Sequence, residues 1–227
     1  MKKYFIGMTK ALGMIGLLII FGITGIGYYR YQQLIEANPI EKKIMNIKKS
    51  VHYTPIQQIN DTFLKAIVAV EDHRFYKHGG MDGIAIVRAM LNNILKGKIV
   101  QGGSTITQQL AKNLYLNQEK TMMRKIQEMF IANTLENNYS KNEILELYVN
   151  VIYYGDGNNG IQMASQNYFN KTPKALSYHE ATLLAGVPQS PTRYSLSKHY
   201  SRATERQQIV IAMLQKQAEK RVLVYTE

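Results

Sequence analysis

The stretch that decides the fold runs from residue 63 to residue 80 and reads FLKAIVAVEDHRFYKHGG. Its apolar residues at positions 63, 67 and 70 recur at i, i+4 and i+7, which is the spacing of one helix face. A polar residue suited to cap a helix, Asn60 or Asp61, stands just before the run. The stretch therefore predicts a helix that is buried along one face and ends in charged residues.

Two adjacent carboxylates, Glu71 and Asp72, close this predicted helix. A carboxylate at the end of a buried helix is held rigidly and partly desolvated, and burial raises its pKa toward the range that suits a general base. His78 and the pair Gly79-Gly80 then break the helix and open a loop. The alternative is an ordinary solvated helix end, which most isolated Glu-Asp pairs are. Glu71 is thus a candidate base, with that alternative still open.

The composition limits the classes of protein to which the chain can belong. Its 227 residues are enough for one domain with a hydrophobic core after an N-terminal segment is set aside. It has no cysteine, which excludes disulfides and thiolate metal sites. The net charge of +12 and the pI near 9.6 favour a polyanionic partner: nucleic acid, an anionic membrane surface or the phosphate groups of a substrate.

An uncharged apolar segment occupies residues 11–29. As a helix it would be about 28 Å long, close to the bilayer hydrocarbon core of about 30 Å. We expect an uncleaved transmembrane anchor there, with a cytoplasmic tail (residues 1–10) before it and a juxtamembrane linker (residues 30–53) after it. A cluster of tyrosines at the far end lies where an aromatic belt would form. The alternative is a cleaved signal peptide, but no small-x-small site follows the run.

The rest of the chain predicts a mostly α fold, because it contains capped helical patterns and no sustained strand alternation. A helix over residues 84–95 should end near Gly97 and carry Arg88 toward the cleft that the loop after Asp72 borders. Further helix starts are indicated by Thr54-Pro55-Ile56-Gln57 (N-cap, proline at N1 and capping-box glutamine), by capping boxes at residues 140–143 and 177–180, and by a last periodic segment at about residues 201–220.

A glycine-rich segment at residues 101–113, QGGSTITQQLAKN, is the second candidate ligand site. Ser104 or Thr105 can cap the helix that follows, and the free N–H groups of a helix N-terminus favour anions. The spacing is not that of a phosphate-binding P-loop. An ordinary capped helix explains the glycines and the serine but not the Gln-Gln-x-x-Lys run. Further on, Arg124 and Glu128 face each other at i, i+4, where the alternative is a common surface ion pair.

Four stretches in this order resemble the signatures of the peptidoglycan glycosyltransferase family, whose domain also occurs at the N-terminus of bifunctional penicillin-binding proteins. The resemblance covers about residues 50–215. A fifth signature is degraded: Arg206, Val210 and Ile211 fit, but Leu214 stands where methionine is expected. The four matching patterns are Glu71-Asp72-x-x-Phe75-x-x-His78-x-Gly80, Gly102-Gly103-Ser104-Thr105-x-Thr107-Gln108-Gln109-x-x-Lys112-Asn113, Arg124-Lys125-x-x-Glu128 and Lys141-x-x-Ile144-Leu145-Glu146-x-Tyr148-Val149-Asn150.

The resemblance implies a lysozyme-like, α-helical glycosyltransferase domain over residues 54–220, with a membrane-facing subdomain beside the cleft. It implies polymerisation of lipid II, the lipid-linked disaccharide-pentapeptide, into glycan strands by inverting transfer with release of polyprenyl diphosphate. We expect the monofunctional form. Ser195-x-x-Lys198 has the SxxK spacing of a transpeptidase, but the accompanying transpeptidase motifs do not follow it.

The resemblance also implies roles for individual residues. Glu71 would deprotonate the acceptor 4-hydroxyl, and Glu128 would act at the leaving diphosphate, either directly, through a divalent metal, or only by orienting Arg124. A diphosphate leaves readily, so cations can serve where a glycosidase needs a proton donor. Asp72 and His78 would mainly hold the loop. The implied substrate-binding set is Asp72, Phe75, His78, Arg88, Gly103, Ser104, Thr105, Gln108, Gln109, Lys112, Lys120, Arg124, Lys125 and Arg206. Within it the implied diphosphate ligands are Arg88, Lys112, Lys120 and Arg124.

No cofactor is certain at this stage. A divalent cation, Mg²⁺ or Mn²⁺, near Glu128 is left open, and an Asp156-x-Asn158 pattern matches a calcium loop only incompletely. The expected partners are lipid II, the growing glycan chain and the lipid bilayer, with other cell-wall synthesis proteins left open and no nucleic acid. The expected location is the bacterial plasma membrane, single-pass, with the catalytic domain on the extracytoplasmic face. A lysozyme-like glycan-cleaving enzyme and an inactive membrane-tethered scaffold are the alternatives.

Overall fold

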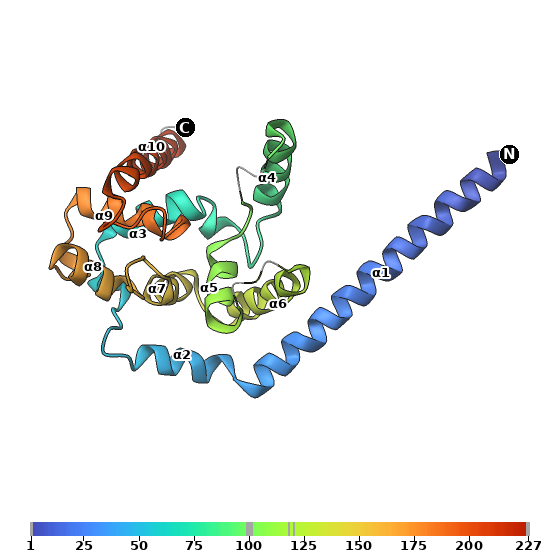
Figure 1. Ribbon diagram of the computed structural model, residues 1–227, viewed down its shortest axis with the longest axis horizontal. Coiled ribbons are helices and arrows are strands. Elements are labelled where there is room, and N and C mark those ends of the chain that lie inside the picture. Colours follow the sequence, from blue (N-terminus) through green and yellow to red (C-terminus); the bar gives the residue numbers. More distant parts are fainter. Residues whose placement is uncertain (1, 99–101, 118, 120, 226–227) are drawn as a thin grey trace.

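The computed structural model describes residues 2–98, 102–117, 119 and 121–225, which form a helical domain with one long helix projecting from it (Figure 1). No strand occurs in these residues, which contain an isolated bridge between Tyr153 and Asn159. The predicted mostly α fold is confirmed. The helices are α1 (Lys2–Ala37), α2 (Ile40–Lys48), η1 (Ile56–Gln58), α3 (Asp61–Glu71), η2 (Phe75–Lys77), α4 (Gly83–Lys96), α5 (Ile106–Tyr115), α6 (Met122–Asn138), α7 (Lys141–Val151), α8 (Ile161–Phe169), η3 (Pro173–Ala175), α9 (Tyr178–Gly186), η4 (Val187–Gln189) and α10 (Tyr200–Tyr225).

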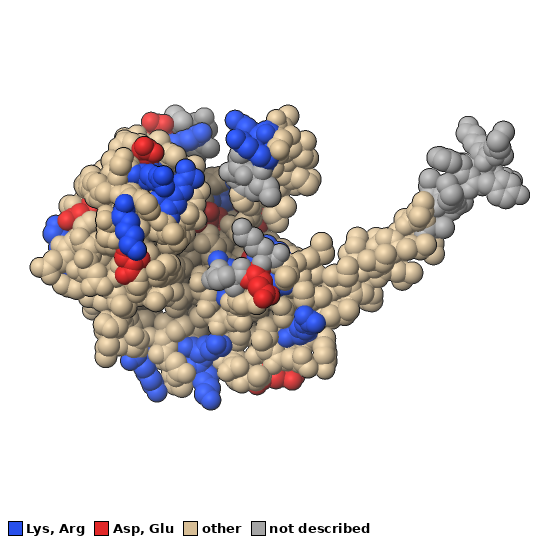
Figure 2. Space-filling model, in the orientation of Figure 1, with Lys and Arg blue, Asp and Glu red and all other residues tan. Residues whose placement is uncertain are grey.

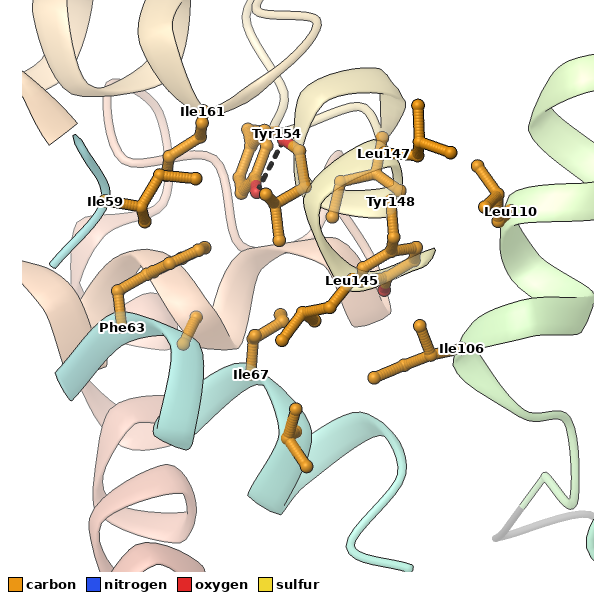
Figure 3. Close-up of a cluster of buried hydrophobic side chains, with 14 of the residues drawn as sticks. Ile59, Phe63, Ile67, Ile106, Leu110, Leu145, Leu147, Tyr148, Tyr154 and Ile161 are labelled. Carbon is orange, nitrogen blue, oxygen red and sulfur yellow. Dashed lines mark hydrogen bonds between the residues drawn. The ribbon is translucent and has the colours of Figure 1, made fainter. Parts of the chain in front are cut away.

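The helix α3 lies in the core of the domain because its inward face is apolar. Phe63 and Ile67 are fully buried, as predicted, in one cluster with Leu145 and Tyr148 of α7 (Figure 3). The helices α9 and α10 pack on α3 as well. Burying an apolar side chain of this size contributes about 1.5–3 kcal/mol. This packing fixes α3 in place, and with it the residue at its C-terminal end, Glu71.

The predicted caps at three helix starts are confirmed. The side-chain oxygen of Asn60 accepts hydrogen bonds from the N–H groups of Thr62 (2.9 Å) and Phe63 (3.2 Å), at the start of α3. Capping boxes at residues 140–143 and 177–180 begin α7 and α9. Each cap satisfies N–H groups that have no partner inside the helix, which is why these local signals define the boundaries well.

The predicted cap at Thr54 is wrong. Pro55 is the N-cap residue of η1, and no side-chain cap is present there. Instead the Thr54 hydroxyl donates to Gln162 (3.2 Å), and a carboxylate oxygen of Glu146 on α7 accepts from the N–H of Ile56 (2.7 Å). A partner about 90 residues away in sequence thus replaces the local cap, and spacing alone cannot reveal it.

The segment predicted as a juxtamembrane linker is mostly helical. The helix α1 continues to Ala37, and α2 follows it. Ile40 and Ile44 of α2 are buried in the core, so this part of the chain packs with the domain. One apolar pair at i, i+4 is too short a pattern to distinguish such a helix from a polar linker. Within α1, residues Leu12–Ala37 are long and apolar enough to cross a membrane.

The C-terminal half of α1 packs against α6. Gly27 lies directly against Ile126, where a larger side chain would not fit without displacement. The rings of Tyr28 and Tyr31 lie 5.2 Å and 5.7 Å from that of Phe130, and α1 therefore joins α6 through aromatic contacts. Two of the tyrosines assigned to an aromatic belt thus contact another helix of the protein.

The helix α4 is attached to the rest of the domain by few contacts (Figure 1). It ends at Gly97 in the left-handed conformation, as predicted. Its periodic residues Ile84, Val87, Leu91 and Leu95 are exposed, however. The apolar spacing therefore identified the helix correctly but not a face buried in the protein.

Two glycines in the loop before α8 allow a matched test of backbone packing. Gly157 and Gly160 have φ of +83° and +82°, which costs alanine about 1–2 kcal/mol at either position. Only at Gly160 would the new Cβ also collide with backbone, at 2.5 Å from the carbonyl oxygen of Asn150. We expect Gly160→Ala to lower the free energy of unfolding by about 3 kcal/mol or more and Gly157→Ala by about 1–2 kcal/mol. Urea unfolding measures both, and equal losses would contradict the close approach.

Candidate active site

A cleft with a volume of about 850 Å³ lies between the end of α3, the helix α4, the start of α5 and α10. Glu71 lines it together with four cationic side chains, Arg88, Lys112, Arg206 and Lys216. The cleft thus brings together residues from the stretches that resemble the first, second and fifth signatures of the family. On the face in Figure 2, lysine and arginine side chains gather over α10 and at the tip of α4, on either side of a hollow.

Glu71 is held on one side by an amide. Nε2 of Gln109 on α5 donates to Oε2 of Glu71 at 2.8 Å. Burial raises the pKa of Glu71, while the Gln109 hydrogen bond and the charges of Arg206 and Lys112 partly offset that rise. The pKa of the Glu71 carboxyl group therefore lies closer to neutral pH than that of a solvated glutamate, as a general base requires.

Three buried polar atoms in this cleft have no hydrogen-bond partner among the described residues: Oε1 of Glu71, Nε of Arg88 and Nε of Arg206. One further such atom occurs elsewhere in the described part, on Ser165. An unpaired buried polar group costs about 1–3 kcal/mol, so natural proteins rarely keep several together. Their gathering around one cleft indicates that a polar ligand completes the site.

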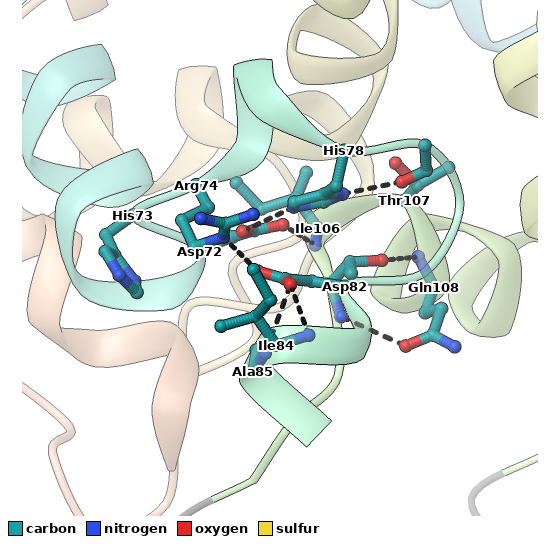
Figure 4. A network of polar contacts seen from close by, with 12 residues as sticks. Asp72, His73, Arg74, His78, Asp82, Ile84, Ala85, Ile106, Thr107 and Gln108 are labelled. Atoms are coloured by element: carbon teal, nitrogen blue, oxygen red, sulfur yellow. Dashed lines mark hydrogen bonds and ion pairs between the residues drawn. The ribbon is translucent and has the colours of Figure 1, made fainter. Parts of the chain in front are cut away.

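The loop after α3 is held by a network of charged side chains (Figure 4). Asp72 accepts from the N–H of Ile106 (3.1 Å) and pairs with Nε2 of His78 (2.8 Å). Asp82 caps α4 through its Oδ1 and accepts from Nε of Arg74 at 2.9 Å through its Oδ2. Burial raises the pKa of Asp82, but the hydrogen bonds from the start of α4 and from Arg74 outweigh it, so the pKa is lowered. The network thus joins the loop to α4 and α5.

This network does not suit a divalent cation. Ligand atoms of Asp72, His78 and Asp82 lie within 4.8 Å of one another. Each carboxylate oxygen nevertheless already accepts a hydrogen bond, and Arg74 supplies a positive charge.

Phe75, predicted to bind substrate, belongs to the same loop; its side chain is fully buried and does not line the cleft.

A second cluster of charges lies at the start of α6. Glu128 is buried, and its two oxygens accept from Nη1 of Arg124 (2.6 Å) and from Nζ of Lys125. Lys125 also donates to Ser104 at 2.8 Å, and Ser104 lines the cleft. The predicted Arg124–Glu128 pair is confirmed; its carboxylate is buried, its guanidinium is partly exposed, and Lys125 is a third partner. Both oxygens of Glu128 are occupied by cations, so its surroundings do not suit a divalent metal ion at those atoms either.

Lys112 connects the two groups of charges. Burial lowers its pKa, and its ammonium interacts electrostatically with Glu128, Arg124 and Lys125 on α6 and with Glu71. Lys112 thus couples electrostatically to both Glu71 and Glu128. Lys120, the remaining predicted cation, lies outside the described residues.

Several predicted ligand residues also have structural roles. Thr105 caps α5 and forms a capping box with Gln108, which explains this glutamine without a ligand. The Thr105 hydroxyl also donates to the carbonyl of Gly80 at 2.8 Å. Gly103 lies where a Cβ would approach the Cα of Ile86 to 3.0 Å, so the glycine permits close packing on α4.

Two weaker motifs from the sequence have structural explanations. The hydroxyl of Ser195 is buried and donates to Asp156 (2.9 Å to Oδ1), as does that of Ser197. Burial raises the pKa of Asp156, but hydrogen bonds from Ser195, Ser197 and Tyr168 outweigh it and lower the pKa to about 2. These contacts close a loop, and they account for Ser195-x-x-Lys198 without a transpeptidase and for Asp156 without calcium.

The sequence analysis missed His73 as a cleft residue. Its Nε2 lies 3.2 Å from Nη1 of Arg88, and burial together with that guanidinium lowers the pKa of His73. Its position directly after Glu71-Asp72 was the available signal. Lys216 and Gln217 of α10 also line the cleft, and no motif marks them.

A helical domain with an activated carboxylate in a cation-lined cleft defines a candidate enzyme that acts on an anionic substrate. The family model described as Transglycosylase matches residues 38–215, and the chain belongs to this family. That membership confirms the resemblance to the peptidoglycan glycosyltransferases.

The similar proteins are penicillin-binding proteins. Penicillin-binding protein 2D of Bacillus subtilis is 46% identical over 76% of this chain and 25% of its own length. Penicillin-binding protein 1A of Aquifex aeolicus is 47% identical over 70% of this chain and 22% of its own length. The chain thus spans about a quarter of the length of these curated relatives.

The raised pKa of Glu71 predicts a pH-dependent effect on stability. Its folded-state pKa lies above the ordinary value of 4.5, so its contribution is fully present below that value and is lost as the pH rises through the folded-state pKa. We expect Glu71→Gln to unfold at a higher temperature than the wild type at pH 8, with the difference vanishing near the ordinary pKa.

A control with the opposite sign is available in α7. Hydrogen bonds from Ser140 lower the pKa of Glu143, so its contribution is present above its ordinary pKa and is lost as the pH falls. Glu143→Gln should therefore lower the unfolding temperature at pH 8. If Glu71→Gln behaves in the same way, Glu71 is not destabilised by burial.

Proposed function

We propose that this protein is a peptidoglycan glycosyltransferase that polymerises lipid II into glycan strands. The observation that carries the proposal is the cleft that Glu71 lines with Arg88, Lys112 and Arg206, where buried atoms of Glu71, Arg88 and Arg206 have no hydrogen-bond partner among the described residues. Membership of the transglycosylase family supports the same reaction. A base and a set of cations are the two parts that transfer from a diphosphate-linked sugar requires.

In this mechanism Glu71 takes the proton of the acceptor 4-hydroxyl. The oxygen attacks the anomeric carbon of the growing chain from the side opposite the diphosphate, so the configuration inverts and polyprenyl diphosphate leaves. Lys112 and Arg124 neutralise the charge on the departing diphosphate. Lys112 interacts electrostatically with Glu71 and with the charges around Glu128, which supports a role for it between the base and the leaving group.

The role of Glu128 is to orient cations. Its two oxygens are paired with Arg124 and Lys125, and the second of these also holds Ser104 at the cleft. With both oxygens occupied by charged donors, the Glu128 carboxylate is placed to hold these cations in position. The neighbouring cations also repel a divalent metal ion at this position, so the mechanism assigns charge neutralisation to the side chains.

The substrate is delivered from the membrane. In this proposal the apolar part of α1, which is long enough to cross a membrane, spans the bilayer. The exposed apolar residues of α4 then offer a surface for the acyl chains. Beside α4 lies a second cavity, of about 820 Å³, which is lined by Met81, Ile86, Met90 and Ile94 and shares Gly103 and Ser104 with the cleft. We place the short N-terminal tail in the cytoplasm and the domain outside the cell, where lipid II is polymerised.

Polymerisation of labelled lipid II in detergent tests this function. The wild type should give a ladder of glycan strands and Glu71→Gln none, while lipid II binding, measured by fluorescence anisotropy, stays within about threefold of the wild type. That result separates loss of the base from loss of the fold. Soluble fragments released from purified cell wall would instead identify a hydrolase, and binding without turnover by the wild type would identify a scaffold.

Substitution of Lys112 tests the role of the cations. Losing one charged hydrogen bond to phosphate costs about 1.5–3 kcal/mol, so kcat/KM for Lys112→Gln should fall about 10- to 100-fold. Lys65→Gln, on the exposed side of α3, removes the same charge away from the cleft and should leave kcat/KM unchanged. Equal effects of the two substitutions would indicate that only the net charge of the protein matters.

A further inference from the structure

We propose that Tyr148 positions Glu71 for catalysis by acting through Gln109, an inference that rests on the proposed role of Glu71 as the base. The three residues form a chain of two hydrogen bonds. The Tyr148 hydroxyl donates to Oε1 of Gln109 at 3.1 Å, and Nε2 of Gln109 donates to Oε2 of Glu71 at 2.8 Å. Tyr148 itself does not touch the cleft, so it is a positioning residue.

The two hydrogen bonds can point in only one direction while Glu71 is ionised. A carboxylate only accepts hydrogen bonds, so the amide of Gln109 must present its NH₂ group to Glu71. Its carbonyl oxygen then faces Tyr148, and the tyrosine must be the donor. The hydroxyl of Tyr148 thus selects the orientation of Gln109 that stabilises the charged form of Glu71.

Tyr148 is well suited to fix this orientation. It is fully buried on α7, in the same cluster as Ile67 of α3 and Leu110 of α5. Burial also raises its pKa well above the ordinary value, so the hydroxyl keeps the proton that it donates. The hydrogen bonds from Tyr148 through Gln109 to Glu71 therefore join three packed helices, and Tyr148 cannot move without disturbing the core.

A buried tyrosine needs a hydrogen-bond partner whatever its role, so structure alone could explain the contact. Tyr154 provides the comparison. It is equally buried in the same cluster, but its hydroxyl donates to the main-chain oxygen of Val149 at 3.3 Å and does not lead to Glu71. Removing either hydroxyl costs one buried hydrogen bond, but only Tyr148 is connected to the carboxylate.

The test compares Tyr148→Phe with Tyr154→Phe in the full chain in detergent. Without the hydroxyl, Gln109 loses the partner that keeps its NH₂ group toward Glu71, so the ionised form of Glu71 is less stabilised. We expect the acid limb of the kcat/KM profile for lipid II to shift to higher pH in Tyr148→Phe. On that limb the rate should fall about three- to tenfold, with recovery at high pH, and Tyr154→Phe should keep the wild-type profile.

A second measurement does not depend on turnover. The pKa of Glu71 can be followed by ¹³C NMR in protein labelled at the glutamate carboxyl carbon, with the signal assigned by its loss in Glu71→Gln. It should rise in Tyr148→Phe and not in Tyr154→Phe. An unchanged pKa in Tyr148→Phe would overturn the inference. A raised pKa in a protein that does not polymerise lipid II would support the link while rejecting the proposed function.

A double substitution tests whether Gln109 transmits the effect. If Tyr148 acts through Gln109, Tyr148→Phe should add nothing to the pKa shift already caused by Gln109→Ala. Independent, additive shifts would overturn the proposed route.

Discussion

The burial of Glu71 is the constraint on which the rest of this structure depends. Taking a carboxylate out of water costs several kcal/mol even after the protein relaxes around it, which is a large part of the total stability of about 5–15 kcal/mol that a domain has. The carboxylate must therefore be compensated. Gln109 supplies a hydrogen bond, and Arg206 and Lys112 supply positive charge. The cations of the cleft are thus required by the fold before any substrate binds.

The same compensation explains why the cleft suits an anionic ligand. Among the carboxylates that line the cleft, Asp82 is paired with Arg74 and Asp72 with His78, which leaves Glu71 beside Arg88, Lys112 and Arg206. Burial lowers the pKa of both Lys112 and Arg206. A bound diphosphate would supply the missing negative charge and the missing acceptors. The buried charges and unpaired polar atoms that lower the stability of the protein are therefore the groups that would bind such an anion.

Local signals in the sequence predicted the scaffold well. Asn60, Thr105 and the two serine capping boxes act within four residues of their partners, so the helix starts could be read directly. Contacts between distant residues could not be predicted. Tyr148 and Gln109 are 39 residues apart, and Ile56 and Glu146 are 90 apart. Family resemblance named Glu71 and the cations together, but whether a side chain lines the cleft or supports it, as with Phe75 and Gln108, depends on packing.

The helix α6 links the apolar helix α1 to the charged site. Along one side Ile126 and Phe130 receive Gly27 and the tyrosines of α1, and Tyr31 hydrogen-bonds Thr134 at 2.7 Å. At its start the same helix carries Arg124, Lys125 and Glu128. A helix is rigid over so few turns, so the position of α1 and the position of these charges are not independent. The apolar helix α1 is therefore part of the support of the site, because it is packed against the helix that holds the cations.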